Sequence, residues 1–190
     1  MAIENPTRRR FSVAEFLELD KLGMFERDER VELIEGEILV MPAPGPEHNS
    51  RAMRFDYFLQ DRLRGLALVQ VAGTAVVSRD SAPSPDIMVL RYRDDFYAHA
   101  NPQPGDILAL VELSYSTLRN DRRRKLRLYA SCGIGEYWIV DLAGHTIERY
   151  RQPAGEKYSE RIVFRHGEAI AFAAFPDAIF QVDELLGPEE

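Results

Sequence analysis

Apolar positions recur along the chain at both helical and strand spacing, which predicts a mixed architecture of helices and strands. Ser12 and Glu15 form the pattern of a capping box, so we expect a short helix over 13–19. A longer helix is expected over 47–64, where most apolar residues follow helical spacing. A third is expected over 119–132, where Leu126 and Ala130 share one face and two glycines end the helix.

Short apolar runs bounded by turn residues predict the strands. A hairpin is expected over 30–41, with a tight turn at Glu35-Gly36. The other predicted strands are 68–71, 74–78, 86–90, 107–113, 137–141 and 146–151, with 161–164 and 169–172 forming a hairpin at the edge. Strands mixed with two main helices predict an α/β or α+β fold around a central mixed sheet.

Length and composition limit the classes of protein. The 190 residues suit one domain, and we expect a loose arm over 1–12 before a single domain over 13–186. A net charge of −7 argues against a passive nucleic-acid coat protein. The single cysteine, Cys132, excludes an internal disulfide and multi-cysteine zinc sites. With no apolar run of membrane-spanning length and no signal-peptide core, we expect a cytoplasmic protein without a membrane partner.

Two acidic residues in apolar strands are the strongest candidates for chemistry. Asp86 starts one predicted strand, and Glu112 lies inside the most apolar one. A buried carboxylate is costly unless it is paired or binds a metal. Taken singly, Glu112 could form a structural ion pair with an arginine or lysine, and Asp86 could cap the turn after Pro85. On adjacent strands the two could meet and bind Mg²⁺ or Mn²⁺, with the backbone carbonyl of Leu113 as a further ligand.

A basic run occupies the third predicted helix. Lys125 lies in this run, and Tyr129 follows one turn later on the same face. A lysine near a metal-bound water can orient that water and offset phosphoryl charge. We expect Arg122 to contact substrate, because a phosphate backbone would sit on such a patch. The alternative is an ordinary solvated helix face. The basic residues of this run are Arg119, Arg122, Arg123, Arg124, Lys125 and Arg127.

Glu32 in the predicted hairpin and His48 in the second helix are weaker candidates. Strand alternation places Glu32 on one face and Glu35 and Glu37 on the other. Acids near a turn are usually exposed, and His48 fits a surface residue or a helix cap equally well. The sequence contains no P-loop, no dinucleotide-binding fingerprint and no nucleophile elbow.

Several short motifs occur in a characteristic order, although none is specific alone. They are VELIEGE at 31–37, Met41-Pro42, His48, Ser84-Pro85-Asp86, Val111-Glu112-Leu113-Ser114, Ser116-Thr117, Asp121, Lys125, Tyr129 and 135–141. In this order and spacing they resemble the Uma2 family, formerly called DUF820, whose members are described as restriction-endonuclease-like. The resemblance covers about 13–180, nearly the whole chain.

The resemblance implies a PD-(D/E)XK nuclease-like fold, in which a mixed central β-sheet is flanked by α-helices. Asp86 then matches the first acid of that motif and Glu112 the second. The motif's lysine normally lies two residues later, where this chain has a serine, and the resemblance implies that Lys125 replaces it from the following helix. Glu32 matches an acid that such folds often contribute from the N-terminal region. Where the family usually has a proline, this chain has Tyr115, which removes no ligand.

The leading interpretation is therefore a metal-dependent endonuclease that hydrolyses DNA. Asp86 and Glu112 would bind Mg²⁺ or Mn²⁺, and Lys125 would position water or stabilise the transition state. Glu32 would lie in the outer shell or bind a second ion. The expected substrate contacts are His48, Arg122 and Tyr129.

Two other functions stay open at this point. One is a non-catalytic nucleic-acid-binding or assembly module on the same fold, since fold does not fix function. The other is a hydrolase of another phosphoester, such as a nucleotide. A homodimer would suit cleavage of both DNA strands. The aromatics at 137–138 and 172–180 could supply its interface, although a core position is the more ordinary reading.

Overall fold

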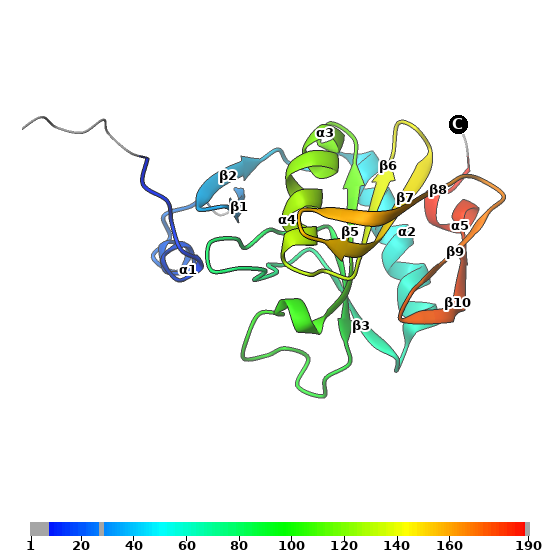
Figure 1. Ribbon diagram of the computed structural model, residues 1–190, viewed down its shortest axis with the longest axis horizontal. Helices are drawn as coiled ribbons and strands as arrows, with labels where there is room; N and C mark the ends of the chain where they lie inside the picture. The colour runs from blue at the N-terminus through cyan, green and yellow to red at the C-terminus, as the bar shows by residue number, and fades with distance from the viewer. Residues whose placement is uncertain (1–7, 27–28, 189–190) are drawn as a thin grey trace, which may run out of the picture.

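A six-stranded mixed sheet forms the centre of the computed structural model, which describes residues 8–26 and 29–188 (Figure 1). The strands lie in the order β3-β4-β5-β6-β7-β8. Strands β5 and β6 run parallel, and the other neighbouring pairs are antiparallel. Their bounds are β3 (Ala67–Val71), β4 (Ile87–Arg91), β5 (Ile107–Ser114), β6 (Glu136–Asp141), β7 (Thr146–Ala154) and β8 (Lys157–Phe164). Residues 1–7 of the predicted arm lie outside the described residues.

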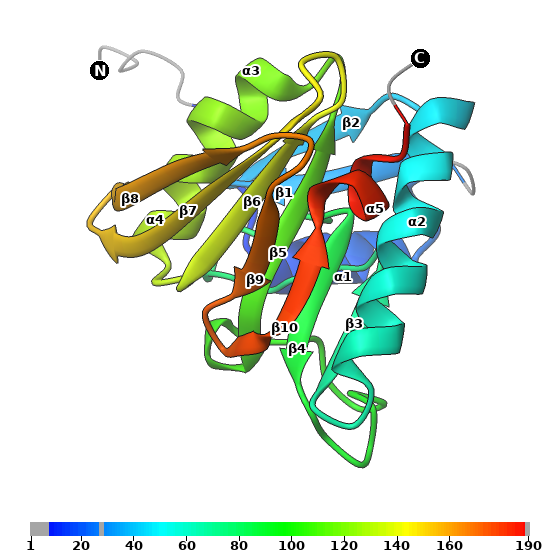
Figure 2. The same ribbon diagram turned by 90° about the vertical axis from the view of Figure 1, so that its right-hand side faces the viewer.

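Helices cover both faces of this sheet (Figure 2). Helix α2 (Pro46–Leu63) and helix α5 (Val182–Leu186) lie on one face with the small sheet of β9 (Ala169–Phe172) and β10 (Phe175–Gln181). The other face carries one helical segment that connects β5 to β6. Its parts are α3 (Leu118–Asn120), a π-helix η2 (Asp121–Lys125) and α4 (Leu126–Ser131).

Each face of the sheet has its own apolar core. Trp138 packs with Phe55 and Leu59 of α2, whereas its neighbours Tyr137 and Ile139 pack in the core on the other face. Successive residues of β6 alternate in this way because the pleat of a strand points them to opposite faces. The predicted fold class, a mixed central sheet flanked by helices, is confirmed.

The N-terminal elements form where local chemistry favours them. Helix α1 (Val13–Lys21) begins at a capping box, in which the Ser12 N–H donates to Glu15 over 2.9 Å. Strands β1 (Arg30–Ile34) and β2 (Glu37–Met41) form the predicted hairpin. Its turn residues Glu35 and Gly36 both have positive φ, 52° and 76°, as a tight two-residue hairpin turn requires.

One predicted strand and one predicted hairpin are wrong. The segment 74–78 is not a strand of the sheet, because its backbone bonds to the loop at 81–83, as in the 2.9 Å bond from the Ala75 N–H to the Pro83 carbonyl. Its alternating pattern reflects burial rather than sheet pairing. The segments 161–164 and 169–172 do not pair with each other, since β8 pairs with β7 and β9 pairs with β10.

The C-terminal region and the segment before β5 also differ from the expectation. Strand β10 and helix α5 follow the last strand that the sequence predicted, and a 3-10 turn η1 (Pro104–Asp106) lies between the predicted strands 86–90 and 107–113. Four of the aromatics considered for a dimer interface are core residues, each at most 1% exposed, and the fifth, Phe175, is partly buried against the same core. The four are Tyr137, Trp138, Phe172 and Phe180. No helix among the described residues is long and apolar enough to cross a membrane.

Candidate active site

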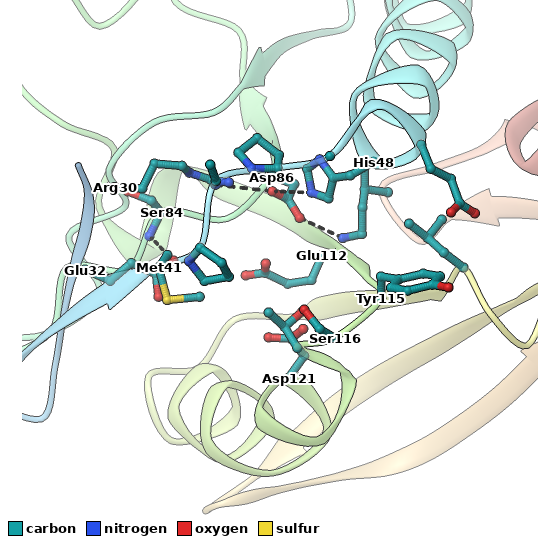
Figure 3. A pocket seen from close by; sticks show the side chains of 18 of the residues that line it. Arg30, Glu32, Met41, His48, Ser84, Asp86, Glu112, Tyr115, Ser116 and Asp121 are labelled. Atoms are coloured by element: carbon teal, nitrogen blue, oxygen red, sulfur yellow. Dashed lines mark hydrogen bonds and ion pairs between the residues drawn. The ribbon is translucent and has the colours of Figure 1, made fainter. Parts of the chain in front are cut away.

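A cavity of about 350 Å³ lies where β5 ends and the chain enters β4. Its walls come from the β1–β2 hairpin, the proline-rich segment 42–46, the start of α2, the turn after β5 and the π-helical segment. Figure 3 shows acidic side chains from several of these elements facing its interior. The buried charged residues that line it are Glu32, Asp86, Glu112, Asp121 and Lys125.

Asp86 is fixed by three donors immediately before β4. Its Oδ1 lies 3.1 Å from Nε2 of His48 and 3.4 Å from a guanidinium nitrogen of Arg30. Its Oδ2 accepts a 2.8 Å hydrogen bond from the Leu113 N–H. Burial raises the pKa of Asp86, but the hydrogen bonds from His48 and Leu113 and the charge of Lys125 outweigh it and leave the pKa below its usual value. Asp86 is therefore held ionised and in one orientation.

Glu112 and Glu32 are bridged by one ammonium group. Lys125 Nζ donates to Oε1 of Glu112 and to Oε1 of Glu32, each over 2.9 Å. The Tyr129 hydroxyl also donates to Oε1 of Glu112 over 2.9 Å. No described residue hydrogen-bonds Oε2 of Glu112, so that oxygen is available to a ligand.

Burial and like charges set the electrostatics of this cluster. Burial raises the pKa of Glu112 well above its usual value, and the nearby Asp121, Asp86 and Glu32 reinforce the rise against the opposing charge of Lys125. Burial lowers the pKa of Lys125, but the surrounding carboxylates outweigh it and hold the pKa above its usual value. The ammonium group therefore stays charged.

Asp121 adds a further carboxylate that the sequence analysis placed in the family pattern but not among the site residues. Its Oδ2 accepts a 2.8 Å hydrogen bond from the Ser114 hydroxyl. Its Oδ1 is buried without a hydrogen-bond partner among the described residues, and the same holds for Oε2 of Glu32. An acidic residue inside a basic run was the one signal that could have singled out Asp121.

The basic run does not form a free patch on the described surface. Arg122 pairs with Glu148 and Asp141, Arg124 with Glu37, and Arg127 with Glu35. Strand alternation predicted that Glu35 and Glu37 share a face away from Glu32, which is wrong for Glu37. Glu37 lies opposite Ile34 in the hairpin, and Ile34 shares a face with Glu32, so Glu32 and Glu37 point to the same side. The exposed members without an ion pair among the described residues are Arg119 and Arg123.

The oxygen atoms around Asp86 fit a hard divalent cation. The Leu113 N–H points toward Asp86, and the carbonyl of an extended residue projects to the same side as its N–H. The donor set would thus be Asp86, Oε2 of Glu112, the Leu113 carbonyl and water. Among the described residues, no group of three or more His, Cys, Asp or Glu side chains is arranged to hold a metal ion.

The structure brings most of the predicted site residues to this one cavity. Lining residues among them are Glu32, His48, Asp86, Glu112, Leu113 and Lys125. Tyr129 is fully buried behind Glu112, and Arg122 lies outside the cavity in its ion pairs with β6 and β7. Both readings of Glu112 apply, because it is half of an ion pair and also faces the cavity. Two further residues were not predicted at the site: Arg30, which contacts Asp86, and Ser84, whose N–H donates to Glu32 over 3.2 Å.

Comparisons with known proteins agree with this architecture. The family model "Uma2: Putative restriction endonuclease" matches residues 13–183. A crystal structure of a putative nuclease belonging to DUF820 from Anabaena variabilis superposes with a TM-score of 0.68 at 18% sequence identity, covering 93% of this chain and 97% of that chain. No curated protein matches the chain. The family match, which covers most of the sequence and confirms the resemblance, shows that the chain belongs to the Uma2 family.

Proposed function

We propose that the chain is a metal-dependent endonuclease that hydrolyses DNA phosphodiester bonds. The observation that carries this proposal is the meeting of Asp86 and Glu112, from adjacent strands, beside the Leu113 backbone in one cavity. Membership of a family described as restriction endonucleases, and the nuclease-like fold, support it. The family description, restriction endonuclease, is the reason for proposing DNA as the substrate.

Asp86, Glu112 and the Leu113 carbonyl would hold Mg²⁺ or Mn²⁺. The bound ion would activate a water molecule and neutralise charge on the phosphodiester. His48 and the Leu113 N–H donate to Asp86 and keep its carboxylate ionised and oriented for binding the ion. His48 and Arg30 also line the cavity, where they can contact a non-bridging phosphate oxygen.

Lys125 is suited to electrostatic stabilisation rather than proton abstraction. Its pKa is raised by the surrounding carboxylates, so the ammonium group does not serve as a general base. From its position 2.9 Å from Glu112, it can orient a water molecule and stabilise negative charge that develops on the phosphoryl group. Glu32 holds this ammonium from the opposite side and acts as a positioning residue.

The test is cleavage of DNA by the purified protein in Mg²⁺ and in Mn²⁺. Substrates are a supercoiled plasmid and a circular single-stranded DNA, so that both forms of DNA are sampled. We expect cleavage that depends on the ion and is lost in Asp86→Asn and Glu112→Gln. The matched control is Glu148→Gln, which changes an equally buried acid outside the cavity. Cleavage that persists in both site variants at the wild-type rate would contradict the proposal.

The buried ion pairs also favour a second candidate function. Lys125 already neutralises part of the charge of Glu32 and Glu112, as a purely structural cluster would. A non-catalytic nucleic-acid-binding or assembly module on this fold would need these acids only to be paired, without a bound metal ion. DNA binding without cleavage in either ion would support this candidate and contradict the nuclease.

A further inference from the structure

The cavity has apolar side walls around its acidic floor. Figure 3 shows Met41 and Tyr115 on opposite sides of Glu112. Other apolar lining residues are Pro42, Ala43, Pro44 and Leu142. Tyr115 is 61% exposed and makes no hydrogen bond or ring contact with any described residue, so its ring is available to a ligand. A phosphate ion alone would gain nothing from such walls, whereas a ring system would.

The backbone around Tyr115 is held in place. The preceding residue, Ser114, donates from its hydroxyl to Asp121 over 2.8 Å, and its carbonyl accepts from the Leu142 N–H over 3.0 Å. Just beyond, the Asn120 N–H donates to the Thr117 carbonyl over 2.7 Å. The aromatic ring therefore projects from a fixed turn directly after β5, which lowers the entropic cost of stacking on it.

The depth of the acids restricts which form of DNA can reach them. Asp86 and Glu112 are 8% and 4% exposed, so a phosphodiester must enter the cavity to contact both. The volume of about 350 Å³ is at the lower end of ligand-site volumes and suits about one nucleotide. A base in a duplex is held by pairing and stacking, and unstacking it has an energetic cost. A base in a single strand can turn onto an aromatic ring.

The charge distribution points the same way. Binding to duplex DNA normally depends on many lysine and arginine contacts with phosphates. Here Arg122, Arg124 and Arg127 are engaged with acids of the same chain. The basic side chains that line the cavity, Arg30, His48 and Lys125, also contact carboxylates. Within the basic run, only Arg119 and Arg123 have no ion pair among the described residues, so few phosphate contacts are available there and other contacts must add to the affinity.

We propose that this site selects single-stranded DNA, with Tyr115 stacking on a base next to the phosphodiester that reaches Asp86 and Glu112. This inference rests on the proposed nuclease function and specifies its substrate. Tyr115 is the specificity-determining residue, and Met41 with the proline-rich segment forms the opposite wall. A stacked base would also explain why the turn after β5 exposes an aromatic side chain at the entrance to the cavity.

The experiment measures binding rather than cleavage. A single-stranded oligonucleotide containing one 2-aminopurine, and the same oligonucleotide annealed to its complement, are titrated with protein in Ca²⁺. Affinity is followed by anisotropy and stacking by quenching of 2-aminopurine. The variants are Tyr115→Ala and Tyr115→Phe, with Tyr57→Ala as the control, since Tyr57 is 70% exposed on α2 outside the cavity.

We expect the single strand to bind about tenfold more tightly than the duplex. Tyr115→Ala should weaken single-strand binding by about tenfold and remove the quenching, because base–aromatic stacking has that strength. Tyr115→Phe and Tyr57→Ala should bind as the wild type does. The affinity should fall only weakly with salt, with a slope of log K against log salt shallower than about −2, because few phosphates are paired.

The outcomes separate this inference from the proposed function. Equal binding of both DNA forms, with Tyr115→Ala unchanged and cleavage intact, would overturn the inference and leave the nuclease proposal standing. Loss of binding in Tyr115→Phe as well as in Tyr115→Ala would also overturn it, because the hydroxyl rather than the ring would then be responsible. Neither binding nor cleavage of any DNA would overturn both.

Discussion

Two buried acidic clusters are served by the same short π-helical segment, yet they differ in how fully their charges are paired. The outer cluster consists of Glu148 and Asp141 with Arg122 and Arg161. In it, Oε1 of Glu148 accepts from Nε of Arg122 over 2.9 Å, and Oε2 accepts from the Tyr150 hydroxyl. Burial raises the pKa of Glu148, but these donors outweigh it and leave the pKa below its usual value.

The pocket cluster consists of Glu32, Asp86, Glu112 and Asp121 with Lys125. Here the one buried lysine pairs with only two of the four acids, Glu32 and Glu112. Two buried carboxylate oxygens have no hydrogen-bond partner among the described residues, and the pKa of Glu112 is raised rather than lowered. Burial of an acid is therefore not what distinguishes a site from a structural ion pair. An incomplete set of partners facing a cavity is the distinguishing feature.

The largest expected effect follows from removing the shared cation. Lys125→Met leaves Glu32 and Glu112 buried without their ammonium, and we expect it to lower the free energy of unfolding by about 3–5 kcal/mol. Arg122→Met in the outer cluster should cost about 1 kcal/mol, because Arg161 remains beside Glu148 and Arg122 is partly exposed. Urea denaturation measures both. Equal losses in the two variants would remove the distinction between the clusters.

The next effect concerns activity. Glu112→Gln keeps an oxygen where Lys125 and Tyr129 donate but removes the charge that would bind a metal ion. We expect DNA cleavage to fall by at least about 100-fold, because metal coordination supplies several kcal/mol of transition-state stabilisation. The melting temperature should stay constant or rise, since one of four like charges is gone. A lower melting temperature with unchanged cleavage would show that Glu112 is structural.

The reverse pattern is expected for the outer cluster. Glu148→Gln should lower the free energy of unfolding by about 1–2 kcal/mol at neutral pH and leave cleavage unchanged. Because the pKa of Glu148 is lowered in the folded protein, its contribution is present above its usual value near 4.5 and is lost as the pH falls through the lowered pKa. Wild type and variant should therefore converge in acid. A difference that persists at low pH would contradict the ionic origin.

Much of the fold and the main acids could be predicted because local signals carry them. Asp86 and Glu112 stand out as acids on apolar strands, and the register that pairs Ile87 with Val111 then brings them together. The capping box at Ser12 and the turn at Glu35-Gly36 are equally local. The segment 74–78 was wrongly predicted as a strand, because an alternating pattern indicates which residues are buried and does not identify the backbone partner.

What could not be predicted depends on contacts between distant segments. The π-helical turn brings both Asp121 and Lys125 to the cavity, and its irregular hydrogen bonding, with the Leu126 N–H donating to the Asp121 carbonyl, has no signature in the sequence. Arg122 was expected at the substrate because a basic run looks alike whether its charges are free or paired. Its partner Glu148 lies 26 residues later on another element, so no local pattern reveals the pair.

The smallest expected effect gives the sharpest comparison, because the two clusters each contain a tyrosine hydroxyl that donates to their central glutamate. Tyr129→Phe and Tyr150→Phe delete the same group, and each should lower the free energy of unfolding by about 1 kcal/mol. Tyr129→Phe alone should reduce kcat, by about fivefold, because it frees the Glu112 carboxylate to reorient. KM should not change, since Tyr129 is buried behind Glu112 and cannot touch substrate. Steady-state kinetics on an oligonucleotide measure both constants. A raised KM in Tyr129→Phe would instead support the substrate contact that the sequence suggested. An equal fall of kcat in Tyr150→Phe would mean that both variants lose activity through lower stability and not through the positioning of Glu112.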